Sequence, residues 1–245
     1  DMLGRIHTYE EFLQSYHWAR KAGFSNINVD LMFAIPGQTC ENWKHNLETI
    51  AELSPEHISA YSLIIEEGTP FAQKKLILPT EDEEYQMYED TAEILRKYGF
   101  HQYEISNYAR DGFECRHNKG YWQRTEYLGA GLGAASLFQG KRFSNTRDMQ
   151  TYLADSTEPE KIREDVTALS RNNEIEEFMF LGLRMTEGIS ERQFERNFGC
   201  RIEDGSVLAK YKEMDLLEHT GEFWRFTRKG IHVSNPVLAD FLLDE

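Results

Sequence analysis

The residues with the most chemical potential in this chain are six consecutive ones, His117-Asn118-Lys119-Gly120-Tyr121-Trp122. They follow Cys115 and Arg116, directly after a strand-like run. An imidazole nitrogen can ligate a metal ion, and phenol and indole rings can stack on a planar ligand. The structural alternative is a hydrogen-bonded histidine beside a half-buried Tyr–Trp pair in a loop, which is the commoner role for these residue types. The surrounding sequence has to decide between the two.

Length and charge exclude several classes of protein. With 245 residues, 40% of them hydrophobic, the chain can form one large domain or two smaller ones around a substantial core. Its net charge of −15 argues against a general binder of nucleic acid or anionic membranes. The sequence has no run of apolar residues long enough to predict a membrane span. The opening residues, Asp1 to Arg5, predict a chain that starts partway through a longer protein.

The chain has three cysteines, Cys40, Cys115 and Cys200, which are odd in number and far apart. Such a set favours the reducing cytosol over a disulfide framework, so a cytoplasmic location is predicted. None of the three belongs to a CxxC or CxxxCxxC pattern, so the sequence offers no zinc or iron–sulfur motif of its own.

The first hundred residues alternate between helix and strand patterns. Capping boxes that begin at Thr8 and Thr80, and an N-cap at Thr39, predict helices that end near residues 23, 99 and 53 respectively. Alternating hydrophobic residues predict a strand over 26–33, and two further strands are predicted over 57–65 and 101–108. This alternation predicts an α/β fold with right-handed βαβ units and a parallel sheet.

The first predicted strand has one polar face, formed by Asn26, Asn28 and Asp30. A strand covered by helices on both faces would be apolar throughout. Polar residues on one face instead favour a β/α barrel, whose interior is polar near the strand ends that carry ligands. For Asp30 itself, a binding role and a role as a capping or turn carboxylate remain equally open.

The segment 127–136 is rich in glycine but matches neither the P-loop nor the dinucleotide-binding spacing. It predicts a strand at which the backbone approaches a ligand or another strand closely. A short extended piece is predicted over 142–145, and 156–160 is the predicted linker.

The last part of the chain predicts helices over 173–185, 189–199, 207–217 and 236–243, with a hairpin between 223–226 and 231–233. The first three of these helices and the hairpin suggest a winged-helix-like plan. Residues 170–245 nevertheless carry ten Lys and Arg against fifteen Asp and Glu, whereas a DNA-binding domain should be basic. The predicted role is therefore a scaffold.

Four motifs in order carry a resemblance to a known family: NVDLMFAIPGQT at 28–39, IEEGTPF at 65–71, YEISNYA at 103–109 and CRHNKGYW at 115–122. Together with LGRIHT at 3–8, they make the chain similar to the heme chaperone branch of the radical S-adenosylmethionine proteins. This branch is known as oxygen-independent coproporphyrinogen III oxidase-like. The resemblance covers nearly the whole chain. It implies the C-terminal portion of a partial, TIM-like β/α barrel over 1–160 and a small winged-helix-like helical domain over 171–245.

The resemblance also implies two cofactors. S-adenosylmethionine would contact Arg5 and Asp30, and the backbone of Ile64. The family's [4Fe–4S] cluster is held by a CxxxCxxC motif that this sequence lacks. Without the cluster no electron reaches the sulfonium, so the chain as given is expected to be catalytically inactive. Two positions depart from the family pattern: Ala34 replaces a usual glycine, and Ala135 replaces a histidine found in many relatives.

The third implication is heme. The HNxxYW pattern marks the chaperone branch, with His117 as the expected axial ligand of heme iron, Tyr121 and Trp122 packing on the macrocycle and Asn118 positioning the segment. Cys115 is a rival ligand, and Arg116 is a candidate partner for a propionate. The expected partners are heme or porphyrin and client heme proteins, with a possible homodimer through exposed strand edges. The alternative is the oxidase of porphyrin biosynthesis, which decarboxylates two propionates of coproporphyrinogen III.

Overall fold

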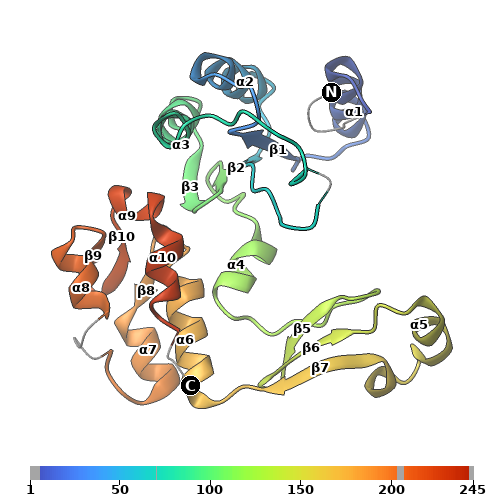
Figure 1. Ribbon diagram of the computed structural model, residues 1–245, viewed down its shortest axis with the longest axis vertical. Coiled ribbons are helices and arrows are strands. Elements are labelled where there is room, and N and C mark those ends of the chain that lie inside the picture. The colour runs from blue at the N-terminus through green and yellow to red at the C-terminus, as the bar shows by residue number, and fades with distance from the viewer. Residues whose placement is uncertain (1–5, 70, 203–206, 243–245) are drawn as a thin grey trace. The chain divides into compact units, whose positions relative to one another are not determined.

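The computed structural model describes residues 6–69, 71–202 and 207–242. The chain divides into two compact units, Asp1–Cys115 and Arg116–Glu245, and Figure 1 labels the elements of both. Among the described residues, no helix is long and apolar enough to cross a membrane.

The first unit alternates helices and strands as the sequence predicts. Its elements are α1 (Tyr9–Lys21), β1 (Asn28–Phe33), α2 (Cys40–Glu52), β2 (His57–Ser62), α3 (Glu81–Lys97), β3 (His101–Glu104) and β4 (Asn107–Ala109). The capping boxes at Thr8 and Thr80 are confirmed, since each threonine accepts from the N3 backbone while the N3 glutamate accepts from the threonine backbone. The helices therefore begin where the sequence indicates.

The prediction of a third strand over 101–108 is wrong. The chain reverses at Ile105 and Ser106, so β3 and β4 form an antiparallel hairpin, and the open sheet has the order β1-β2-β4-β3. The Glu104 carboxylate accepts from the Ser106 amide at 3.0 Å and from the Asn107 side chain, which stabilises the reversal. Among the described strands of this sheet, β1 and β2 pair in parallel and the other neighbours are antiparallel. The fold is α/β with a mixed sheet, and the described residues do not close into a barrel.

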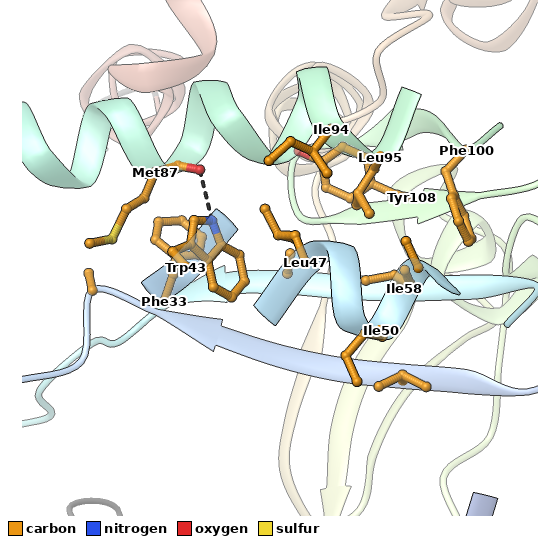
Figure 2. Close-up of a cluster of buried hydrophobic side chains, with 14 of the residues drawn as sticks. Phe33, Trp43, Leu47, Ile50, Ile58, Met87, Ile94, Leu95, Phe100 and Tyr108 are labelled. Carbon is orange, nitrogen blue, oxygen red and sulfur yellow. Dashed lines mark hydrogen bonds between the residues drawn. The ribbon is translucent and has the colours of Figure 1, made fainter. Parts of the chain in front are cut away.

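The core of the first unit lies between the sheet and helices α2 and α3, as Figure 2 shows. Trp43 of α2 is fully buried, and its indole N–H donates to the Met87 carbonyl and the Thr91 hydroxyl, both at 2.9 Å. On α3, the fully buried Met87 lies in the core, whereas Tyr85 is 49% exposed.

Replacing Trp43 by phenylalanine is expected to lower the free energy of unfolding by about 2 kcal/mol. The change removes the indole N–H that donates to the Met87 carbonyl and the Thr91 hydroxyl, and it leaves a small void in a closely packed core. Chemical denaturation followed by circular dichroism measures the loss. The matched control is Trp18→Phe, since Trp18 is 61% exposed and should tolerate the change within about 0.5 kcal/mol. Equal losses in the two variants would contradict the role given to Trp43.

Ala34, which departs from the family pattern, has a left-handed backbone with φ of 55° and is buried. Glycine adopts this conformation without steric cost, which gives a physical reason for the family's usual residue there. Alanine has the smallest side chain that still carries a Cβ, so this chain keeps the turn after β1 at a modest conformational cost.

The second unit begins with α4 (Arg116–Trp122). An antiparallel sheet with the order β5-β6-β7 follows, formed by β5 (Ala135–Phe138), β6 (Lys141–Asn145) and β7 (Arg163–Ala168), with α5 (Met149–Asp155) and the short helix η1 (Pro159–Ile162) between β6 and β7. The predicted linker over 156–160 does not separate the two compact units, which divide at Cys115 and Arg116. Its residues 159 and 160 belong to η1, which leads into a paired strand. The predicted close approach in the glycine-rich segment is confirmed at Gly129, where a Cβ would lie 2.3 Å from the Ala135 carbonyl oxygen.

The remaining elements pack around a core of their own. They are α6 (Arg171–Gly182), β8 (Ile189–Ser190), α7 (Glu191–Phe198), α8 (Val207–Glu213), β9 (Leu217–Thr220), β10 (Phe223–Phe226), α9 (Arg228–His232) and α10 (Ser234–Ala239). The predicted hairpin has the wrong partner strand, since β10 pairs with β9 and residues 228–232 are helical. The sheet order is β8-β10-β9.

Candidate functional site

The segment that carries the predicted heme ligand is a helix, α4, and not the loop of the structural alternative. His117 is exposed and lies one turn before Tyr121, with the two ring centroids 4.5 Å apart in an edge-on arrangement. Tyr121 in turn packs edge-on against Tyr127 at 4.7 Å. The structure thus brings together an accessible imidazole, one tyrosine ring that packs against it and a second tyrosine ring that packs against the first.

Trp122 lies on a different side of α4 from His117, because five residues correspond to about 140° around a helix. The Arg184 guanidinium lies over its ring, 4.5 Å from the centroid, and the ring lines a cavity of about 60 Å³ with Phe178 and Ile189. The indole Nε1 is buried, and within the described part of the chain it has no hydrogen-bond partner. Asn118 is half-buried on the same side of α4 as Trp122. Trp122 therefore fixes α4 to the rest of the second unit.

A buried ion-pair cluster, formed by Glu177, Arg124 and Arg142, holds the end of α4. Arg124 follows α4 and donates from Nε to one oxygen of Glu177 at 2.9 Å, while Arg142 of β6 donates to the other oxygen. Burial alone would raise the pKa of Glu177, but the hydrogen bonds from Arg142 and Arg124 outweigh it and hold the pKa below its ordinary value. Sequence reasoning missed this cluster, although Glu177 adjoins the predicted apolar residues Phe178 and Met179 of α6.

The second predicted site residue, Asp30, is an exposed carboxylate on the polar face of β1. The register pairs Asn28 with His57 and Asp30 with Ser59, so these four residues share one face of the β1–β2 pair. Asn28 donates from Nδ2 to Asp30 Oδ1 at 2.6 Å. Asp30 also borders a cleft of about 290 Å³ whose lining includes residues of α1 and α2.

The other two predicted contacts of S-adenosylmethionine are the backbone of Ile64 and the side chain of Arg5. Ile64 is 70% exposed and follows the end of β2, where the preceding residue, Leu63, donates to the Phe33 carbonyl at 2.9 Å. Within the described part of the chain, the Ile64 backbone makes no backbone hydrogen bond, so its polar groups are available to a ligand. Arg5 lies outside the described residues.

The residues present fit S-adenosylmethionine but not its cluster. Ribose hydroxyls donate hydrogen bonds, and the exposed Asp30 carboxylate beside a cleft near the lower end of the usual pocket size of roughly 300–1,000 Å³ can accept them. The cofactor, when bound to a reduced cluster, supplies a radical; Asp30 would hold its ribose and the Ile64 backbone would contact it. Cys40, Cys115 and Cys200 do not form a cluster motif. In the described ranges, no group of three His, Cys, Asp or Glu residues is placed to hold a metal ion.

Comparison with known proteins gives consistent results. The family model of the HemN C-terminal domain matches residues 169–233. The heme chaperone HemW of Lactococcus lactis is 39% identical and that of Bacillus subtilis 38%, in each case over 99% of this chain and 65% of the relative. A solved structure of coproporphyrinogen III oxidase (HemN) from Escherichia coli, a radical SAM enzyme, matches with a TM-score of 0.78 at 21% identity, over 96% of this chain and 59% of that one.

The α/β fold of the chain is thus the fold of a radical SAM enzyme. Over nearly its whole length the chain is similar to the heme chaperone HemW, and it has the fold of the coproporphyrinogen III oxidase HemN, a radical SAM enzyme. This confirms the resemblance inferred from the four motifs. The chain spans about two thirds of the length of these curated relatives, 65% in both cases.

Proposed function

We propose that this protein is a heme chaperone that binds heme at helix α4 and passes it to client proteins. The observation that carries the proposal is the exposed His117 at the start of α4, supported from one side by Tyr121. A neutral imidazole is a strong ligand for heme iron, and the aromatic ring beside it offers a surface for the macrocycle. The two relatives named heme chaperone HemW, each of which matches 99% of this chain, support the proposal.

The other residues of the motif have distinct roles in this proposal. Tyr121 contacts the macrocycle beside His117, whereas Trp122 and Asn118 act at the site by holding α4 in place. Arg116, which is exposed at the first position of α4, is the proposed partner of a heme propionate.

The substitution His117→Ala is expected to weaken heme binding at least about tenfold, because it removes the axial nitrogen while the Tyr121 surface remains. Heme titration followed in the Soret region measures the affinity, and the shift of the band reports the ligand. The matched control is His45→Ala, since His45 is also exposed but lies on α2. Cys115→Ser tests the rival ligand. An unchanged titration and spectrum for His117→Ala would refute the proposed ligand.

The second candidate function is the oxidative decarboxylation of coproporphyrinogen III, which the structural match to HemN favours. That match is 21% identical and supports the fold alone. The two functions are separated by an assay of propionate decarboxylation on the protein with a reconstituted [4Fe–4S] cluster and S-adenosylmethionine. Turnover would favour the oxidase, and heme binding without turnover would favour the chaperone.

Some finer features belong to the same proposal. We propose that the first unit is part of a β/α barrel within a domain over 1–160, and that 171–245 is a winged-helix-like scaffold. The β8-β10-β9 sheet and the family match at 169–233 support the second boundary. A cytoplasmic location, heme-protein clients and a homodimer are further parts of the proposal. The reducing environment suggested by three free cysteines supports the location.

A further inference from the structure

The polar face of the first unit contains a continuous chain of hydrogen bonds that ends at Asp30. The Tyr103 hydroxyl lies 2.9 Å from His57 Nε2, and His57 Nδ1 lies 2.6 Å from Asn28 Oδ1. Asn28 then donates from Nδ2 to Asp30 Oδ1 at 2.6 Å. The chain of contacts joins three strands, β3, β2 and β1.

The direction of every bond follows from the chemistry of the groups. Asp30 accepts only, so the Asn28 group beside it is the amide nitrogen; the flipped amide would place two oxygens in contact. Asn28 Oδ1 then faces His57 and Ser59, whose hydroxyl donates to it at 3.2 Å. Because this oxygen only accepts, the proton of His57 is on Nδ1, and the bare Nε2 accepts from Tyr103.

His57 is built to stay in this neutral form. The ring is 4% exposed, and burial lowers its pKa below the ordinary value, although the Asp30 carboxylate acts in the opposite direction. A doubly protonated ring would reverse the bond to Tyr103, because both ring nitrogens would then be donors and the phenol oxygen would have to accept. The ring thus serves as a fixed connector between a buried phenol and an exposed carboxamide.

We propose that His57 is a positioning residue which, through Asn28, holds the Asp30 carboxylate in the orientation that binds the ribose of S-adenosylmethionine. The inference rests on the proposed cofactor role of Asp30. An exposed aspartate samples several rotamers, and a ligand that needs one of them loses affinity in proportion to its population. The buried His57 fixes the side chain of Asn28, and the hydrogen bond from Asn28 restricts Asp30 to one rotamer.

The first test measures the tautomer of His57 in the ligand-free protein by long-range proton–nitrogen NMR. The expected result is a neutral ring with its proton on Nδ1, the opposite of the tautomer that free histidine prefers. Asn28→Ala should lose the preference for a proton on Nδ1, because it removes the acceptor of that proton. Ser59→Ala should keep the preference, because Ser59 donates to Asn28 but makes no hydrogen bond of the series that joins Tyr103, His57, Asn28 and Asp30. A proton on Nε2 in the wild-type protein would overturn the inference.

The second test measures the affinity for S-adenosylmethionine itself by NMR titration. Asn28→Ala and His57→Leu should each weaken binding about threefold to tenfold, whereas His57→Asn, which can keep a donor near the position of Nδ1, should recover part of the loss. Asn28 is exposed, so Asn28→Ala is expected to fold. The test therefore remains valid if His57→Leu fails to fold. Partial recovery distinguishes positioning from a general effect on folding.

The variant Asp30→Asn separates the two proposals. No binding to the wild-type chain, or unchanged binding by Asp30→Asn, refutes the cofactor role of Asp30 and with it this inference. A loss for Asp30→Asn without a loss for Asn28→Ala leaves the cofactor site intact and refutes only the positioning role of His57.

Discussion

Replacing Glu177 by glutamine is expected to lower the free energy of unfolding of the second unit by about 3 kcal/mol. Glu177 is 7% exposed and pairs with both Arg124 and Arg142, so the change removes the charge that compensates the largely buried Arg124 and the partly exposed Arg142. Chemical denaturation measures the loss. Hydrogen exchange at the amides of α4 and α6 should rise together, because Glu177 joins the end of one helix to the other.

The matched control is Glu174→Gln. Glu174 lies one turn earlier on the same helix and faces the same Arg124, but at 3.8 Å and with a side chain that is 39% exposed. Exposed pairs of this kind contribute about 0–1 kcal/mol. Equal losses for Glu174→Gln and Glu177→Gln would contradict the special role of the buried pair.

The Glu177 cluster also predicts a dependence on pH. The pKa of Glu177 lies below its ordinary value of 4.5, so the stability it contributes is fully present above that value. It is lost as the pH falls from 4.5 through the lowered pKa of the folded state. The difference between the wild-type protein and Glu177→Gln should therefore be constant near pH 7 and shrink near pH 3. A difference that grows in acid would show that the sign is wrong.

Local signals in the sequence located most of the helices but not the sheet order. Thr8 and Thr80 predict where their helices begin, because both residues of a capping box lie within four positions of each other. The reversal at Ile105 and Ser106 was missed, since no glycine or proline marks a turn within 101–108. The turn depends on the Glu104 carboxylate, whose two hydrogen bonds no hydrophobic pattern records.

At the candidate site, too, the sequence predicts some features and not others. The residue types of His117 and Asp30 and their family motifs were sufficient to select them from the sequence. Their supports come from distant parts of the chain: Glu177 is 53 residues from Arg124, and His57 is 29 residues from Asn28. Such contacts follow from strand register and helix packing, so they could be found only in the folded chain.

Gly188→Ala is expected to lower the free energy of unfolding by about 3 kcal/mol or more, with the largest effect on the β8–β10 pairing. A Cβ at this position would lie 2.0 Å from the Trp224 carbonyl oxygen and 2.6 Å from Arg225 Cβ, closer than atoms can approach. Backbone strain adds to this, since φ of +82° is left-handed. Relief requires a shift of β10, because the contact is with backbone, and the Ile189–Trp224 pair of the sheet would separate.

Gly221→Ala isolates the steric contribution. Gly221 is also left-handed, with φ of +65°, but a Cβ there would meet nothing within 4 Å, so this variant should lose only about 1 kcal/mol from backbone strain. Thermal and chemical denaturation of the two variants should differ by about 2 kcal/mol. Similar losses would mean that β10 yields easily at Trp224, and that the β8-β10-β9 sheet is less rigid than its close backbone contact implies.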